Sequence, residues 1–220
     1  MSSRFIEVKP FSTDFRTVNM TYQQSEISPR PAVTITALVL FVAIGVLTAA
    51  VGEWQFSVLI RSDWANLYGS MVFNAVYLTG AFVVTRLIFR LIPRRKLAFL
   101  LCAGLAAVGG LLVEWFLIGN SPWGNPQASQ IGMAAYWACL VVVPLIVVEP
   151  DPRLRPLKRT IAIYAAVYTA AALAAWALLP GETWGVAYHL WSVIFGYLGL
   201  AVITVIGYVR TEGITSRSVQ

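Results

Sequence analysis

Six long apolar runs dominate this sequence and limit the folds that are open to it. Each contains about 20 residues, the length of helix that crosses a hydrocarbon core of about 30 Å. Lipid offers the backbone no water to bond with, so a run of this length forms a helix. The runs are Ala32–Gly52, Trp64–Leu91, Leu97–Gly119, Ile131–Val148, Thr160–Leu179 and Val186–Val209. The sequence therefore predicts an all-α integral membrane protein with six transmembrane helices.

Composition supports the same class. Hydrophobic residues make up 58% of the 220 residues, charged residues make up 12%, and the mean hydropathy is +0.72, well above that of a soluble domain. We expect residues 1–30 to form a cytoplasmic N-terminal tail, 31–210 the six-helix transmembrane domain and 211–220 a cytoplasmic C-terminal tail. Residues 1–30 lack the basic start and short apolar core of a secretory signal peptide.

The basic residues predict the orientation of the helices. Of the 16 Lys and Arg residues, all but Arg61 lie in the tails or near the connections between runs two and three and between runs four and five. By the positive-inside rule, both tails and both connections are cytoplasmic, as expected for a bacterial inner membrane protein. The net charge of +6 is then a topology signal. We expect no nucleic-acid partner, because that would require a soluble basic face with exposed aromatic residues.

One basic cluster is dense enough to bind lipid headgroups. It lies where the second run meets the third, at the membrane boundary, where anionic phosphates attract Lys and Arg side chains. Its members are Arg86, Arg90, Arg94, Arg95 and Lys96. The expected partners are therefore the lipid bilayer and other membrane chains, which include a second copy of this one.

A period of 61 residues suggests an internal repeat. Trp54, Trp115 and Trp176 are spaced at this interval, and the first two each follow a glutamate, Glu53 or Glu114. The simplest architecture is three consecutive up-and-down helical hairpins, which could descend from one hairpin. In that case Glu53 is the positional counterpart of Glu114.

The tryptophans are concentrated on the outer side of the membrane. An ordinary aromatic belt decorates both interfaces, so this asymmetry exceeds the simplest expectation. It indicates either anchoring at the outer boundary or an aromatic surface for a partner protein, a lipid or another hydrophobic ligand. The eight residues are Trp54, Trp64, Trp115, Trp123, Trp137, Trp176, Trp184 and Trp191.

Glu114 is the main candidate for a functional group. It lies five residues before Gly119, hence about 8 Å below the outer end of its helix. An unpaired carboxylate at that depth would cost a few kcal/mol or take up a proton, so a partner is expected. His189 lies at a similar depth. The sequence predicts one polar, aromatic ligand-binding pocket formed by Asn74, Glu114, Trp115, Tyr136, Trp137, His189, Trp191 and Ser192.

Several chemistries lack the residues they need. A single histidine cannot supply two haem ligands, and Cys102 and Cys139 both lie in apolar runs without a ligand at metal spacing. Nucleotide-binding glycine loops are also missing from the sequence. We therefore expect no haem, metal or nucleotide cofactor.

Three functions fit these features. We favour a non-catalytic membrane subunit or assembly protein that binds other membrane chains or a hydrophobic ligand through its Trp-rich outer face. The first alternative is a small membrane enzyme acting on a lipid or isoprenoid, with Glu114 and His189 as its acid–base pair. The second alternative is a solute-binding or transport component whose helices enclose a small molecule.

Overall fold

A computed structural model describes residues 31–124, 129–179 and 195–217 of the chain. All regular structure in these residues is helical. The elements are α1 (Pro31–Glu53), η1 (Trp54–Ile60), α2 (Trp64–Leu91), α3 (Arg95–Val113), η2 (Glu114–Ile118), α4 (Gln130–Val148), η3 (Pro152–Leu154), α5 (Arg155–Leu178) and α7 (Leu198–Arg217). Of these, η1 and η2 are π-helices and η3 is a 3₁₀-helix.

Five helical stretches among the described residues are long and apolar enough to cross a membrane. They are Ile35–Leu59, Trp64–Leu91, Arg95–Ile118, Gln130–Val148 and Pro152–Leu178. They correspond to the first five apolar runs of the sequence. The first part of the sixth run, Val186–Val209, lies outside the described residues up to position 194, and α7 covers the run from Leu198 onward. The sixth span therefore stays a prediction.

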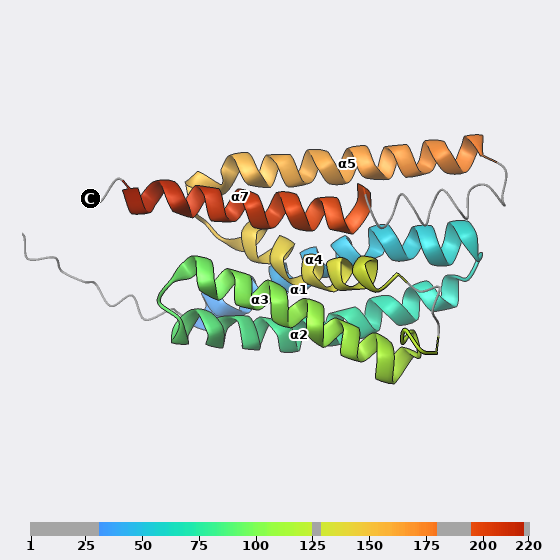
Figure 1. The fold of residues 1–220 in the computed structure, drawn as a ribbon, viewed down its shortest axis with the longest axis horizontal. Helices are drawn as coiled ribbons and strands as arrows, with labels where there is room; N and C mark the ends of the chain where they lie inside the picture. Colours follow the sequence, from blue (N-terminus) through green and yellow to red (C-terminus); the bar gives the residue numbers. More distant parts are fainter. Residues whose placement is uncertain (1–30, 125–128, 180–194, 218–220) are drawn as a thin grey trace, which may run out of the picture.

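Helix α4 is the centre of the bundle. In its most apolar window 56% of the residues are buried, compared with 17–33% for the other four candidate spans. It packs against α1, α3 and α7, while α2 lies on α1 and α5 lies on α7 (Figure 1). The sequence explains this position, because Ala138 to Ile146 is apolar on every side and a helix of that kind is buried.

The two ends of the bundle differ in composition. The α2–α3 connection, the α4–α5 connection and the end of α7 lie together at one end, which we call the Arg-rich end (Figure 1). The η1–α2 turn and the η2–α4 connection lie at the opposite end, which we call the Trp-rich end. Arg61 belongs to the η1–α2 turn, so its separation from the other described basic side chains is seen in the fold as well as in the sequence.

The first helical stretch is longer than the sequence analysis predicted. The prediction ended at Gly52, yet the helical backbone continues through η1 to Ile60. Two polar residues follow Gly52 within this stretch, yet Gln55 is fully buried and Glu53 is bonded to a neighbouring helix. In the third stretch the predicted end at Gly119 is close to the observed one, because Gly119 takes the left-handed conformation (φ +90°) that terminates η2.

Candidate functional site

Both glutamates of the 61-residue period lie where an α-helix becomes a π-helix. Glu53 is the last residue of α1 before η1, and Glu114 is the first residue of η2 after α3. Single π-turns inside α-helices are rare and frequently mark functional sites. At the third position of the period, Ala175 and Trp176 lie inside α5 without such a change. The backbone irregularity thus accompanies the acidic residue and not the tryptophan.

The carboxylate of Glu114 is buried, and both of its oxygens accept hydrogen bonds. Oε1 accepts from the indole Nε1 of Trp137 on α4 at 3.1 Å, and Oε2 accepts from Nδ2 of Asn120 at 2.8 Å. The backbone N–H of Asn120 also donates to the carbonyl of Glu114, at 2.8 Å. Glu114 therefore ties η2 to the following turn and to the central helix.

Glu53 is held in a similar way by the neighbouring residue of α4. The hydroxyl of Tyr136 donates to Oε1 of Glu53 at 3.1 Å and accepts from Nδ2 of Asn74 on α2 at 3.0 Å. One tyrosine hydroxyl thereby joins α1, α2 and α4.

Consecutive residues of α4 thus bind the two glutamates. The rings of Tyr136 and Trp137 meet edge to face, with centroids 5.4 Å apart. The guanidinium carbon of Arg61 lies 3.9 Å from the centroid of the Phe56 ring. Two acidic side chains are therefore bound to adjacent residues of α4 by neutral hydrogen-bond donors.

The absence of a side chain at Gly110 positions the Trp137 ring. A Cβ atom on Gly110 would lie 1.9 Å from Cγ of Trp137, so no other residue fits without moving the ring. The ring also packs against Tyr77, at a centroid distance of 4.7 Å. Helices α3 and α4 can approach closely only because this glycine is present.

Trp115 contacts residues of the turn after η2 and the start of α4. Its indole Nε1 donates to Oε1 of Gln130 at 2.7 Å, and Nε2 of Gln130 donates to the carbonyl of Asn120 at 3.2 Å. Its ring meets that of Trp123 at 5.4 Å. Trp115 therefore braces the turn after η2, and its indole N–H is directed to Gln130 and not to Glu114.

The structure brings together only some of the residues that were predicted to form one pocket. Asn74, Tyr136, Trp137 and Glu114 come together around α4, whereas Trp115 bonds Gln130. His189, Trp191 and Ser192 lie outside the described residues. The sequence analysis did not identify Asn120 as a partner of Glu114. Asn120 directly follows Gly119 at the end of the third apolar run, and a polar side chain at that position could have suggested a hydrogen bond back to Glu114.

A second buried polar group, Gln55, lies two residues beyond Glu53. Oε1 of Gln55 accepts from the Tyr168 hydroxyl on α5 at 3.2 Å, whereas Nε2 of Gln55 has no hydrogen-bond partner among the residues that the structure describes. Nearby on the chain, Asn66 donates to the buried Ser57 hydroxyl at 2.7 Å. These bonds attach η1 to its neighbours and make its polar residues structural.

The predicted headgroup cluster lies at the Arg-rich end. Arg86, Arg90, Arg94 and Arg95 are exposed, and Lys96 is half-buried. Arg86 lies over the Phe82 ring at 5.0 Å, and Arg95 is 3.9 Å from Glu149. Within the described ranges, no group of three His, Cys, Asp or Glu side chains could hold a metal ion.

Comparison with known proteins adds no assignment. No protein-family model, curated protein or solved structure matches the chain.

Proposed function

We propose that the chain is a non-catalytic accessory or assembly subunit of the bacterial inner membrane. In this proposal it has six transmembrane helices in three consecutive hairpins, with both termini cytoplasmic. It binds another membrane chain through the Trp-rich end. The basic residues at the Arg-rich end support this orientation.

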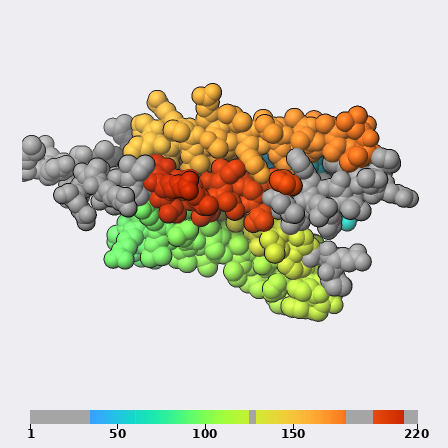
Figure 2. Space-filling model, turned by 45° about the horizontal axis from the view of Figure 1, so that its top comes forward, coloured from blue at the N-terminus to red at the C-terminus, as the bar shows by residue number. Residues whose placement is uncertain are grey.

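An exposed apolar surface on and beside η2 carries the proposal. It consists of Phe116, Leu117, Ile118, Trp123 and Ile131, whose exposed fractions lie between 53% and 73%, and we call it the η2 surface. The end of α3, η2 and the following turn project from the rest of the bundle (Figures 1 and 2). A projecting patch that contains a tryptophan is typical of a protein-binding surface.

The buried hydrogen bonds support this surface. Glu114 fixes η2 to the turn and to α4, Trp115 braces the turn through Gln130, and Gly124 donates to the backbone and side-chain oxygens of Ser121. A surface held in one conformation loses little entropy on binding. Glu114 is then a structural residue that positions a binding surface.

The same contacts favour the subunit hypothesis over the enzyme hypothesis. A general acid or base must reach the proton that it transfers on the substrate. Both oxygens of Glu114 instead accept from groups of the fold, Trp137 and Asn120. Glu114 is also only 8% exposed, so a substrate could reach its carboxylate only after part of the surrounding fold moved.

Photo-crosslinking in native membranes tests the proposal. A photoreactive amino acid replaces Trp123 in one variant and Trp176 in the other, since Trp176 is an exposed tryptophan on α5 (47% exposed). We expect a discrete protein adduct from position 123 and none of the same mass from position 176. Adducts with lipid alone at position 123, or the same protein adduct from both positions, would contradict the proposal. An adduct of twice the chain mass would identify the partner as a second copy.

A further inference from the structure

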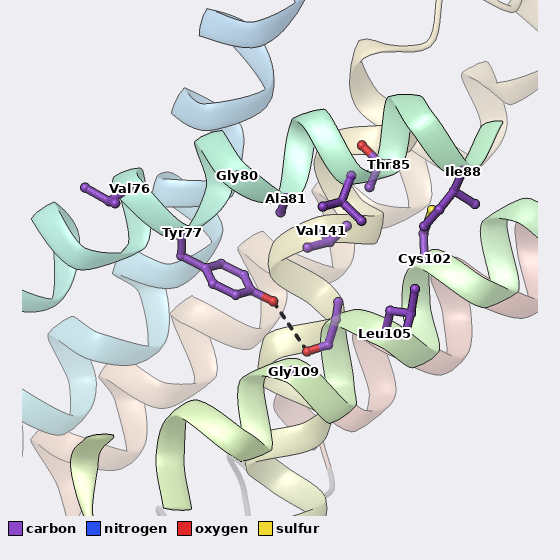
Figure 3. A pocket seen from close by; sticks show the side chains of 12 residues that line it. Val76, Tyr77, Gly80, Ala81, Thr85, Ile88, Cys102, Leu105, Gly109 and Val141 are labelled. Carbon is purple, nitrogen blue, oxygen red and sulfur yellow. Dashed lines mark hydrogen bonds between the residues drawn. The ribbon is translucent and has the colours of Figure 1, made fainter. Parts of the chain in front are cut away.

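An apolar groove separates α2 from α3 (Figure 3). Helix α2 packs mainly on α1 and α3 mainly on α4, so the two walls meet in part, at Ile88, Ala98 and Cys102, and Val141 of α4 forms part of the floor of the space left between them. The groove has a volume of about 430 Å³. Its walls include Gly80, Val84 and Ile88 on α2 and Leu105 and Gly109 on α3.

The polar groups along the groove are already engaged. The Thr85 hydroxyl donates to the carbonyl of Phe82 at 2.8 Å, and the Tyr77 hydroxyl reaches across to the carbonyl of Ala106 at 3.5 Å. An occupant would therefore meet hydrocarbon almost everywhere. Glycine on both walls makes the space available, since a Cβ on Gly80 or on Gly109 would have no atom within 4 Å.

The length of the groove favours a lipid chain over a partner helix. On α2 the lining extends from Val76 to Ile88, which at 1.5 Å per residue is about 18 Å. One leaflet of hydrocarbon is about 15 Å thick, whereas a membrane-crossing helix is about 30 Å long and would extend well beyond the groove. The groove thus accommodates a chain that occupies a single leaflet.

Positive charge lies beyond one end of this groove. Arg90 follows Ile88 by two residues, and Arg94 and Arg95 follow at the start of α3. Among the described residues, Arg90 and Arg94 have no acidic side chain within ion-pair distance, and Arg95 is 3.9 Å from Glu149 in a solvent-exposed pair. These side chains are positioned at the level where the phosphate of a lipid in that leaflet would lie.

We propose that the groove between α2 and α3 binds one acyl chain of an anionic phospholipid, whose phosphate lies against Arg90, Arg94 and Arg95. The site is distinct from the η2 surface and does not depend on a protein partner. Hydrocarbon burial in the groove holds the chain, and the arginines select the charge of the headgroup.

Matched glycine variants test the acyl-chain part. Gly69 and Gly80 lie on the same face of α2, both are exposed, and neither has an atom within 4 Å of an added Cβ, but only Gly80 lines the groove. The probe is palmitoyl-oleoyl phosphatidylglycerol added to the full chain in detergent, with bound lipid counted by native mass spectrometry. Gly80→Leu should weaken binding about tenfold, the loss expected when two methylenes can no longer be buried. Gly69→Leu should leave binding unchanged, and Gly109→Leu should repeat the loss from the opposite wall.

Arginine variants test the headgroup part. Arg94→Gln/Arg95→Gln should lower the preference for phosphatidylglycerol over phosphatidylcholine by about fivefold per arginine. Arg155→Gln/Arg159→Gln, at the same end of the bundle on α5, should leave that preference unchanged. Excess inorganic phosphate should not displace the lipid. Equal effects of Gly80→Leu and Gly69→Leu, equal binding of the two lipids by the unmodified chain, or full displacement by inorganic phosphate would each overturn the proposal.

Discussion

The close contact between Gly110 and Trp137 makes a sharp prediction about stability. In Gly110→Ala the new methyl carbon would lie 1.9 Å from Cγ, 2.3 Å from Cβ and 2.4 Å from Cδ1 of Trp137. These atoms are at the root of the side chain, so a change at the far end of the ring cannot relieve the clash. Trp137 is only 2% exposed and packs against Phe73, Tyr77 and Tyr136. Either α3 moves away from α4 or the ring leaves its site.

The magnitude follows from what either movement removes. Overpacking a core costs about 1–3 kcal/mol. Displacing the indole also breaks its 3.1 Å hydrogen bond to the Glu114 carboxylate, and hydrogen bonds to charged groups contribute about 1.5–3 kcal/mol. Alanine is the better helix former by about 1 kcal/mol, which offsets part of this loss. We expect a net destabilisation of about 2–5 kcal/mol.

Thermal unfolding in detergent, followed by circular dichroism, measures this effect. The matched control is Gly109→Ala, because the neighbouring position has no atom within 4 Å of an added Cβ. It should unfold at or slightly above the temperature of the unmodified chain. The double variant Gly110→Ala/Trp137→Leu should lose less stability than the sum of the two single changes, since the clash is then gone. Equal melting temperatures for the two alanine variants would refute the reasoning.

Three further changes test the buried network and the Arg-rich end. Glu114→Gln turns one acceptor oxygen into a donor and should cost about 1–3 kcal/mol in the same unfolding assay; an unchanged melting temperature would contradict the cross-link. Tyr136→Phe removes the hydroxyl bonded to Glu53 and should cost a similar amount, whereas Tyr68→Phe, an exposed tyrosine on α2, should cost nothing measurable. The pKa of Asp151 is lowered to about 2 by the side-chain and backbone hydrogen bonds from Arg153. The contribution of the Asp151 carboxylate to the free energy of folding is thus complete above the ordinary aspartate pKa and is lost as the pH falls towards 2. In Arg153→Gln, the pKa of Asp151 measured by NMR titration should rise. An unchanged pKa would exclude Arg153 as the cause.

Apolar run length predicted most of the helices. The second run, Trp64–Leu91, has the same limits as α2, and each of the first five runs overlaps one of the five candidate spans. The predicted end of the first helical stretch, Gly52, was wrong. The apolar run stops before Glu53 and Gln55, yet Gln55 is fully buried in the fold and the helical backbone continues past it. Sequence alone does not reveal that Tyr168, 113 residues away, bonds it.

The candidate site was predicted only in part, for a related reason. The 61-residue period and the cost of a buried acid singled out Glu114 correctly as a residue that needs partners. Which donors reach it depends on how each helix is rotated about its axis. Trp115 is adjacent to Glu114 in sequence yet points its indole to Gln130, while Trp137 on α4 reaches the carboxylate. The π-turn at Glu114 changes that rotation locally and has no clear signature in the sequence.

The central claim is that Glu114 supports the η2 surface and that this surface binds another membrane chain. The most direct measurement is native mass spectrometry of the chain released gently from its own membranes, for the unmodified protein, Trp123→Ala and Trp176→Ala. The account predicts a discrete extra protein mass that is retained in Trp176→Ala and lost in Trp123→Ala. A single chain without added protein mass, or the same assembly in all three samples, would contradict it.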